Sequence, residues 1–494
     1  MRYPQTRHGI RSILAGRDGS LPVWQRAAVI ATSRTQCRAR LKSNAPGRGG
    51  GFMIARTMAA LVSMALLAAC GGPRPAEQQG DVCRSIATEG RAPYPWPDIL
   101  QSAAPLRAVR QGDADLLVRP ENRGFREKVN RRYAVPTAKP LEVLSVSAGG
   151  AWGAFSIGFL DGWGHNAGPD PRPNFDIVTG VSTGSMIAPI IFLNDQGNIE
   201  RLRGTYRNLT NDQVFTKRSL LGALSSTSLY DTAPLRRRVE SLLDTEMVLR
   251  IARENEKNRM LALLAVNLDS GVPEVFDITE MASDASRSLE ERRRRIIDVM
   301  MASAAIPIAF PPVFIDGNMY VDGGARRHAF IAREVMAAVQ GQRRELRTSG
   351  LERYSLSAAH RPIGLAIVVS GDMRVMRDCV GKKRLDLLAM AERTQEVVTD
   401  QLLRDSVELL LLQVGQSRAN RARFVDASAL VSYPKSQDAA LRSGLCAIPE
   451  GEDTLFDPAF QDCLDRQGYA VGQRDLIPWK IELRESRMVR SPPS

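Results

Sequence analysis

Histidine is scarce in this sequence, and pairs of metal-binding residues are missing from it. The 494 residues include four histidines and six cysteines. No Cys-x-x-Cys pair occurs, and no cysteine stands near a histidine at the spacing of a metal site, so structural zinc is not expected. We expect no metal and no other cofactor. A repeat of fixed period is also missing, which argues against a repeat array.

The segment Met53–Cys70 lacks the length to cross a bilayer. Its uncharged apolar run is about twelve residues long, whereas a spanning helix needs roughly 20. A start methionine, a positive charge at Arg56 and small residues before Cys70 are instead the layout of a secretory signal peptide. Leu67–Cys70 resembles the lipobox of bacterial lipoproteins, which implies a lipidated Cys70 at the mature N-terminus. We therefore expect a signal peptide over residues 53–69 and membrane anchoring through Cys70. Because Gly-Gly follows rather than Asp, the expected location is the outer membrane of the bacterial cell envelope.

The formal net charge of +13 is concentrated in the first 52 residues. Residues 1–52 contain ten basic residues and one acidic residue, whereas the remainder contains 57 basic and 53 acidic residues. This leader is glycine-rich and has no apolar periodicity, so it is not expected to form a core. We expect that it is not translated and that translation starts at Met53. Without it the basic excess nearly vanishes, and no nucleic-acid partner is predicted.

Composition divides the rest of the chain into three parts. Residues 70–139 are rich in proline and arginine and are predicted to form an extended tether, with one short helix near residues 98–117. Residues 140–335 are predicted to form the core, and residues 336–494 to continue it with surface loops. Four cysteines remain beyond Cys70, and they permit two disulfides in three connectivities or free buried thiols: Cys83, Cys379, Cys446 and Cys463.

The predicted core alternates strands and helices. Leu141–Val146 reads as a buried strand, and a glycine loop and a helix over residues 154–163 follow it. A second strand at 175–179 leads through a tight turn into an apolar helix at 186–193. Later strands are expected at 260–266, 275–278, 363–369 and 423–425, and later helices at 289–303 and 391–414. This order of strands and helices predicts an α/β fold with three layers, in which helices cover both faces of a mostly parallel sheet.

The turn Gly180-Val181-Ser182-Thr183-Gly184 is a GxSxG motif between a strand and a helix. That context is the one a nucleophile elbow needs, because the sharp turn holds the serine in a strained backbone. Side chains at Gly180 and Gly184 would collide with the neighbouring strand or helix. Ser182 is therefore the candidate nucleophile.

A second glycine-rich loop follows the first strand. It reads Ser147-Ala-Gly-Gly-Ala-Trp-Gly153 and opens a helix, so its backbone N–H groups lie at the positive helix end. We expect it to stabilise an oxyanion. It has neither the Lys-Ser/Thr ending of a P-loop nor the GxGxxG spacing, which argues against a nucleotide site.

The residue that activates Ser182 is predicted to be Asp322. It follows a short strand and precedes Gly323 and Gly324, whose flexibility lets the carboxylate turn toward a neighbouring strand end. Asp316, the competing carboxylate, stands in an Asp-Gly pair that predicts a hairpin turn. The histidines downstream of Ser182 lie in no recognisable setting.

Together, the glycine loop, the GVSTG elbow and the later DGG resemble the three signature blocks of patatin-like phospholipases, in the same order. The resemblance covers about residues 141–332. It implies a lipid acyl hydrolase in which Ser182 and Asp322 act as a dyad through an acyl-enzyme, without histidine or metal. The oxyanion hole would be formed at Gly149, Gly150, Ala151 and Gly153, and the substrate would be a phospholipid or another acyl-ester lipid.

The chain departs from the family in the glycine loop. Ser147-Ala148 replaces the common Asp-Gly, and Trp152 replaces a frequent Arg or Lys. Because the hole uses backbone N–H groups, these changes do not exclude activity. We expect Trp152 to pack against acyl chains of the substrate.

Two alternatives stay open at the level of sequence. One is an α/β-hydrolase triad in the chain order Ser182, Asp322 and then His328 or His360. The other is a lipidated binding protein that kept the fold and lost most of its activity, for which the altered loop start is the best support.

Overall fold

The computed structural model describes ten segments of the chain: residues 91–92, 117–118, 139–219, 226–332, 362–376, 387–415, 420–432, 444–449, 455–483 and 488–490. The chain divides into two compact units, residues 1–78 with 380–391 and residues 79–379 with 392–494. Only residues 387–391 of the first unit are described, so the fold below is that of the second. The predicted leader, signal peptide and Cys70 lie outside the described residues, as does nearly all of the predicted tether.

Within the described residues, the main sheet has eleven strands, and nine of them follow the order β17-β16-β13-β11-β3-β4-β7-β10-β9. In addition, β8 pairs with β7, and β2, which lies within the predicted tether, pairs with β8. The strands of this sheet are β2 (Leu117–Val118), β3 (Leu141–Val146), β4 (Ile177–Val181), β7 (Met260–Asn267), β8 (Val272–Asp277), β9 (Val313–Ile315), β10 (Asn318–Asp322), β11 (Ile363–Val368), β13 (Arg421–Val425), β16 (Ile481–Leu483) and β17 (Met488–Arg490).

The centre of the sheet is parallel. Strands β13, β11, β3, β4 and β7 are neighbours that run in the same direction. Val368 of β11 is in register with Val146 of β3, which is in register with Gly180 of β4. The glycine loop and the serine turn therefore leave the sheet at the same edge. On the far side of β7, strand β10 is antiparallel, and its last residue Asp322 pairs with Ala265.

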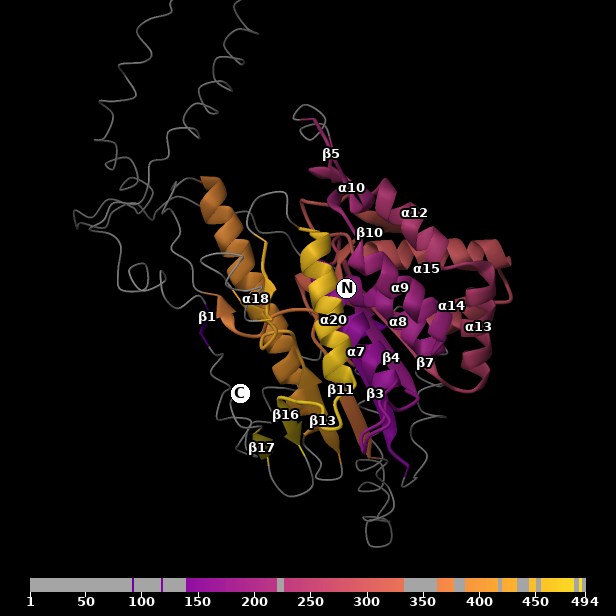
Figure 1. The fold of residues 1–494 in the computed structure, drawn as a ribbon. Helices are drawn as coiled ribbons and strands as arrows, with labels where there is room; N and C mark the ends of the chain where they lie inside the picture. Colours follow the sequence, from indigo (N-terminus) through magenta and orange to yellow (C-terminus); the bar gives the residue numbers. More distant parts are fainter. Residues whose placement is uncertain are drawn as a thin grey trace, which may run out of the picture. The chain divides into compact units, whose positions relative to one another are not determined.

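Helices cover both faces of this sheet. Leu144 and Val146 of β3 belong to one hydrophobic cluster, which includes side chains of α7, α8 and α20. Leu141 and Val143, on the opposite face, belong to a second cluster that includes Val407 and other residues of α18. This alternation confirms the predicted layered α/β fold (Figure 1).

The helices in the described residues are α7 (Gly153–Gly164), α8 (Thr183–Leu193), α9 (Gln196–Arg207), α10 (Asn211–Val214), α12 (Ala233–Leu242), α13 (Thr245–Glu256), α14 (Ile278–Ser283), α15 (Leu289–Ser303), α18 (Leu387–Val414) and α20 (Pro458–Gly472), with short 3-10 turns η4 (Gly150–Trp152) and η5 (Gly323–Ala325). Three two-stranded pairings complete the structure: β1 (Arg91–Ala92) with β12 (Val375–Met376), β5 (Thr216–Lys217) with β6 (Tyr230–Asp231), and β14 (Val431–Ser432) with β15 (Cys446–Ala447). No helix among the described residues is long and apolar enough to cross a membrane.

Three arginines of the charge run on α15 bind neighbouring segments of the protein. Arg292 donates to the carbonyl of Ala282, and Arg293 donates to the carbonyl of Leu243. Arg295 forms two hydrogen bonds with Asp316 at 2.7 and 2.8 Å. These side chains fasten α15 to its neighbours.

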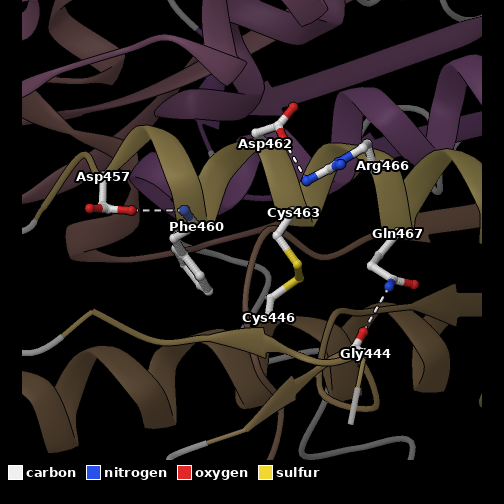
Figure 2. The surroundings of a disulfide bond; sticks show 8 residues. All are labelled: Gly444, Cys446, Asp457, Phe460, Asp462, Cys463, Arg466 and Gln467. Atoms are coloured by element: carbon white, nitrogen blue, oxygen red, sulfur yellow. Dashed lines mark hydrogen bonds and ion pairs between the residues drawn. A yellow bond between two sulfur atoms is a disulfide. The ribbon is translucent and has the colours of Figure 1, made fainter. Parts of the chain in front are cut away.

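The C-terminal helix α20 packs along α7 at backbone distance (Figure 1). A Cβ atom at Gly158 would lie 2.3 Å from the carbonyl oxygen of Asp465, and one at Gly472 would lie 2.4 Å from that of Phe159. A disulfide between Cys463 of α20 and Cys446 of β15 attaches the helix to that strand (Figure 2). It is one of the pairings that the sequence left open, whereas Cys83 and Cys379 lie outside the described residues.

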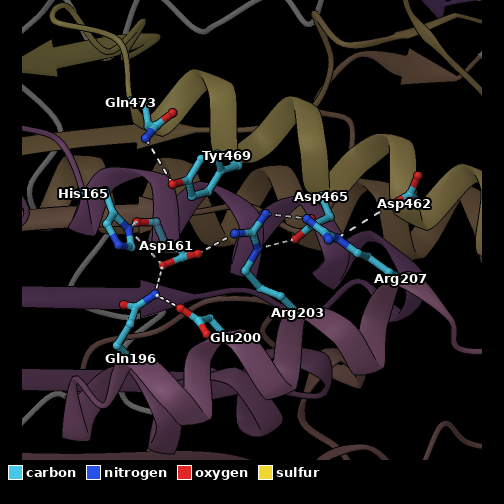
Figure 3. A network of polar contacts seen from close by, with 10 residues as sticks. All are labelled: Asp161, His165, Gln196, Glu200, Arg203, Arg207, Asp462, Asp465, Tyr469 and Gln473. Carbon is cyan, nitrogen blue, oxygen red and sulfur yellow. Dashed lines mark hydrogen bonds and ion pairs between the residues drawn. The ribbon is translucent and has the colours of Figure 1, made fainter.

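A buried ion-pair network holds the inner side of α20 (Figure 3). Arg203 of α9 donates two hydrogen bonds of 2.8 Å to the carboxylate of Asp465, and Arg207 donates a third. Arg203 also pairs with Asp161 of α7. Since the side chain of Asp465 is fully buried, these cations neutralise a charge that would otherwise be costly in the core.

Candidate active site

Ser182 occupies the turn between β4 and α8 in a strained backbone conformation. Its φ and ψ are 53° and −119°, a combination that costs a non-glycine residue about 1–3 kcal/mol. The N–H group of Ser182 donates to the hydroxyl of Ser303 at 3.0 Å, and its carbonyl accepts from the hydroxyl of Ser185 at 2.6 Å. These bonds hold the turn in place, and they were not predicted from the sequence.

Both glycines of the GxSxG motif are required by close contacts. A Cβ atom at Gly180 would lie 2.3 Å from the carbonyl oxygen of Gly184. One at Gly184 would lie 2.3 Å from the carbonyl oxygen of Val146, at the end of β3. The predicted steric reason for both glycines is confirmed, and the contacts show that the serine turn lies against the start of the glycine loop.

Asp322 lies at the end of β10 and meets Ser182. The carboxylate of Asp322 lies beside the hydroxyl of Ser182, which favours its ionised form, and it accepts a hydrogen bond of 2.6 Å from the N–H of Gly324. The backbone N–H of Asp322 donates to the carbonyl of Ala305 at 2.8 Å. Burial raises the pKa of Asp322 to about 7, and the interactions with Ser182 and Gly324 partly oppose this shift. The carboxyl group therefore titrates close to neutral pH.

The competing carboxylate, Asp316, forms part of the predicted hairpin turn. Asp316 and Gly317 connect β9 to β10 with φ values of 49° and 81°, as a tight two-residue hairpin requires. Its carboxylate binds Arg295. It takes no part in the site.

The glycine loop presents free backbone donors at the edge of the sheet. Gly150 has a φ of 55°, which glycine adopts without strain. The N–H groups of Gly149, Gly150 and Ala151 have no hydrogen-bond acceptor within the part of the chain that the structure describes. They remain available to a ligand.

Gly153 differs from its predicted role as a donor. It begins α7, and its N–H donates to the carbonyls of Gly150 and Ala151. A Cβ atom at this position would lie 2.5 Å from the hydroxyl of Thr183. Gly153 therefore lets the loop approach the serine turn and supplies no free N–H.

Ser147 fastens the loop to the sheet. Its buried hydroxyl accepts a hydrogen bond from the N–H of Ser370, which follows β11, at 2.9 Å. The N–H of the next residue, Ala148, donates to the carbonyl of His328 at 2.9 Å. The uncommon start of the loop is therefore well supported by its neighbours.

Trp152 packs against protein. Its ring makes an edge-to-face contact with Phe460 of α20, with ring centroids 5.2 Å apart. This contact gives the half-buried ring a structural role, and the expected contact with acyl chains stays a prediction.

His328 lies near the site and forms no hydrogen bond with the Asp322 side chain among the described contacts. The residue is 6% exposed, and neither ring nitrogen has a hydrogen-bond partner in the described residues. Burial lowers its pKa to about 4. His360, the other member of the alternative triad, lies outside the described residues.

The site shows no feature of a metal centre. No group of three or more histidine, cysteine or acidic side chains in the described segments could hold a metal ion.

Gly323, which follows Asp322, is required by a close contact, because a Cβ atom there would lie 2.6 Å from the carbonyl oxygen of Leu264.

Comparison with known proteins finds a family similarity for the segment that holds this site. No match is found among curated proteins. Among solved structures, VipD from Legionella pneumophila has a TM-score of 0.30 and 12% identity, over 68% of this chain and 67% of that chain. Human GIVD cytosolic phospholipase A2 in complex with methyl gamma-linolenyl fluorophosphonate has a TM-score of 0.25 and 11% identity, over 72% of this chain and 63% of that chain. Residues 144–333 match the family model of patatin-like phospholipase. This segment spans the glycine loop, Ser182 and Asp322, so the part of the chain that holds the candidate site is similar to patatin-like phospholipases.

Proposed function

We propose that the protein hydrolyses acyl esters of phospholipids with a Ser182–Asp322 dyad. The observation that carries the proposal is the position of the strained Ser182 beside a buried carboxylate with a pKa near neutrality. Such a carboxylate can accept a proton at neutral pH, which an ordinary aspartate does poorly.

In the first step, Asp322 accepts the proton of the Ser182 hydroxyl while the serine oxygen attacks the ester carbonyl. The carbonyl oxygen becomes an oxyanion, for which the free N–H groups of Gly149, Gly150 and Ala151 are the donors. Asp322 then gives the proton to the leaving alcohol oxygen, and the ester bond breaks to leave an acyl-enzyme. Water, deprotonated by Asp322, releases the fatty acid in the second step and restores the hydroxyl.

Hydrolysis of phosphatidylcholine vesicles tests this function. We expect Ser182→Ala to abolish fatty-acid release and Asp322→Asn to lower kcat by about 10²- to 10⁴-fold. Thr183→Ser serves as a matched control, since it keeps the hydroxyl that bonds Tyr206 beside the nucleophile. Full activity of the Ser182→Ala protein would contradict the proposal.

The protein is further proposed to be anchored in the bacterial outer membrane through lipidated Cys70. The segment Met53–Cys70 supports this location through its signal-peptide layout. The Cys446–Cys463 disulfide is in keeping with an oxidising compartment. Mass spectrometry of the native protein is expected to find an acylated N-terminal Cys70, and an intact peptide that crosses residues 69 and 70 would rule the anchor out.

A further inference from the structure

Three aliphatic side chains are exposed on segments that border the catalytic site. Ile308 is 71% exposed, Leu455 is 57% exposed and Leu229 is 48% exposed. Ile308 also has a φ of 70°, which is a genuine outlier for a β-branched residue. A strained backbone that holds an apolar side chain in solvent points to a functional role.

The three residues each precede a residue that packs against one small apolar cluster, namely Tyr230, Ala309 or Phe456. Leu209, Val214, Phe215 and Phe310 form its buried part. The N–H of Leu229 donates to the carbonyl of Ile308 at 3.0 Å, so these two residues are neighbours. Leu455 precedes Phe456, whose ring lies 6.5 Å from the ring of Phe215. The three exposed residues therefore adjoin one shared apolar cluster, and together we call them the rim.

Each segment of the rim lies within a few residues, along the chain, of a residue that contacts the catalytic site. Ile308 follows Ala305, whose carbonyl binds the N–H of Asp322. The segment that contains Leu209 follows Tyr206, which hydrogen-bonds Thr183 next to the nucleophile. Leu455 precedes Phe460, which contacts Trp152 of the glycine loop. The rim therefore lies beside the site.

We propose that Leu229, Ile308 and Leu455 insert into the surface of a lipid bilayer and place the catalytic site against it. The proposal rests on the proposed function, since a phospholipid ester lies at the bilayer surface while Ser182 and Asp322 are 7% and 5% exposed. Aliphatic side chains favour transfer from water into acyl chains, and uncharged contacts of this kind resist salt.

Vesicle flotation tests the rim independently of catalysis. The mature chain, residues 70–494, carries Cys70→Ser and Ser182→Ala, so that neither the signal segment, a lipid anchor nor hydrolysis contributes. We expect it to bind phosphatidylcholine vesicles in high salt, and Ile308→Asn and Leu455→Asn each to weaken binding about tenfold. Asparagine tolerates the positive φ at position 308 and is polar.

Leu476→Asn is the matched control. Leu476 is 82% exposed and follows α20 at its far end, where Arg474 accepts a hydrogen bond from Asn166. The length of α7, about 18 Å, separates this end from Trp152 and Phe460. The control is expected to bind vesicles like the parent chain. The proposal would be overturned if the Ile308→Asn and Leu455→Asn proteins bound vesicles as well as the parent chain does. It would also be overturned if Leu476→Asn weakened vesicle binding as much as they do.

Activity on a soluble short-chain ester separates this inference from the proposed function. With Ser182 restored, the Ile308→Asn and Leu455→Asn proteins are expected to hydrolyse it at the parent rate. If both variants lost activity on the soluble ester, these residues would be shown to support the site itself, and the proposed membrane contact would be overturned. A parent chain that binds vesicles but hydrolyses no ester would instead contradict the proposed function and leave the rim supported.

Discussion

The hydroxyl of Ser182, directly after one central strand, lies beside the carboxylate of Asp322, at the end of an antiparallel strand two positions away in the sheet. Among the described residues, no histidine forms a hydrogen bond with either side chain. In the proposed mechanism the pair therefore performs proton transfer alone, and the ionisation of one carboxyl group controls it.

The first prediction concerns the pH dependence of kcat/KM. Asp322 accepts a proton only when ionised, and its pKa is about 7. We expect kcat/KM to fall about tenfold for each pH unit below about 6.5 and to level off above about 8. A soluble ester assayed from pH 5 to 9 measures this profile. An acid limb centred near pH 4 would show that burial does not raise the pKa of Asp322.

The second prediction concerns stability. The pKa of Asp322 is higher in the folded protein than its ordinary value of 3.8, so the folded state binds more protons between about pH 4 and 7. Its contribution to stability is therefore present below pH 4 and is lost as pH rises through about 7. The Asp322→Asn protein should exceed wild type in unfolding free energy above pH 8 by no more than about 4 kcal/mol. Denaturant unfolding should show this difference shrink toward pH 4.

A third prediction separates the dyad from a triad. His328 is buried with no partner for either ring nitrogen among the described residues, and an unsatisfied buried polar group costs about 1–3 kcal/mol. His328→Phe should therefore keep its activity within about threefold and should not lower the melting temperature. His360→Ala should also be active. A loss of 10²-fold or more in either protein, with a normal melting temperature, would favour a histidine base.

The fourth prediction concerns the attachment of α20. The Cys446–Cys463 disulfide closes a loop of 17 residues, for which chain entropy predicts about 3 kcal/mol of stabilisation. The Cys463→Ser protein should lose about that much unfolding free energy. Adding reductant to the wild-type protein should give the same loss, whereas the serine variant should not respond to it. Unchanged stability after reduction would contradict this role.

Local sequence patterns predicted the elements that carry the site. The order of β3, glycine loop, α7, β4, serine turn and α8 follows from apolar periodicity and from glycine positions that close contacts require. The hairpin at Asp316 was predicted from its Asp-Gly pair, and that assignment left Asp322 as the candidate base.

Contacts between residues far apart in the chain could not be predicted from local sequence patterns. Nothing near Ser303 or Tyr206 in the sequence indicates that they support the serine turn, because their partners are brought to them by the sheet. Likewise, the packing of α20 on α7 depends on glycines that meet only in the folded chain. Gly153 was assigned a free N–H because the sequence does not show that a 3-10 turn precedes α7.

Covalent labelling with a fluorophosphonate tests the central claim most directly. The reagent forms a stable adduct only with a serine that is activated as a nucleophile. Peptide mass spectrometry should find one adduct, on Ser182, in the wild-type and His328→Phe proteins, and labelling should be at least 10²-fold slower in Asp322→Asn. An unlabelled Ser182 in folded wild-type protein, or full labelling of the Asp322→Asn protein, would contradict the Ser182–Asp322 dyad.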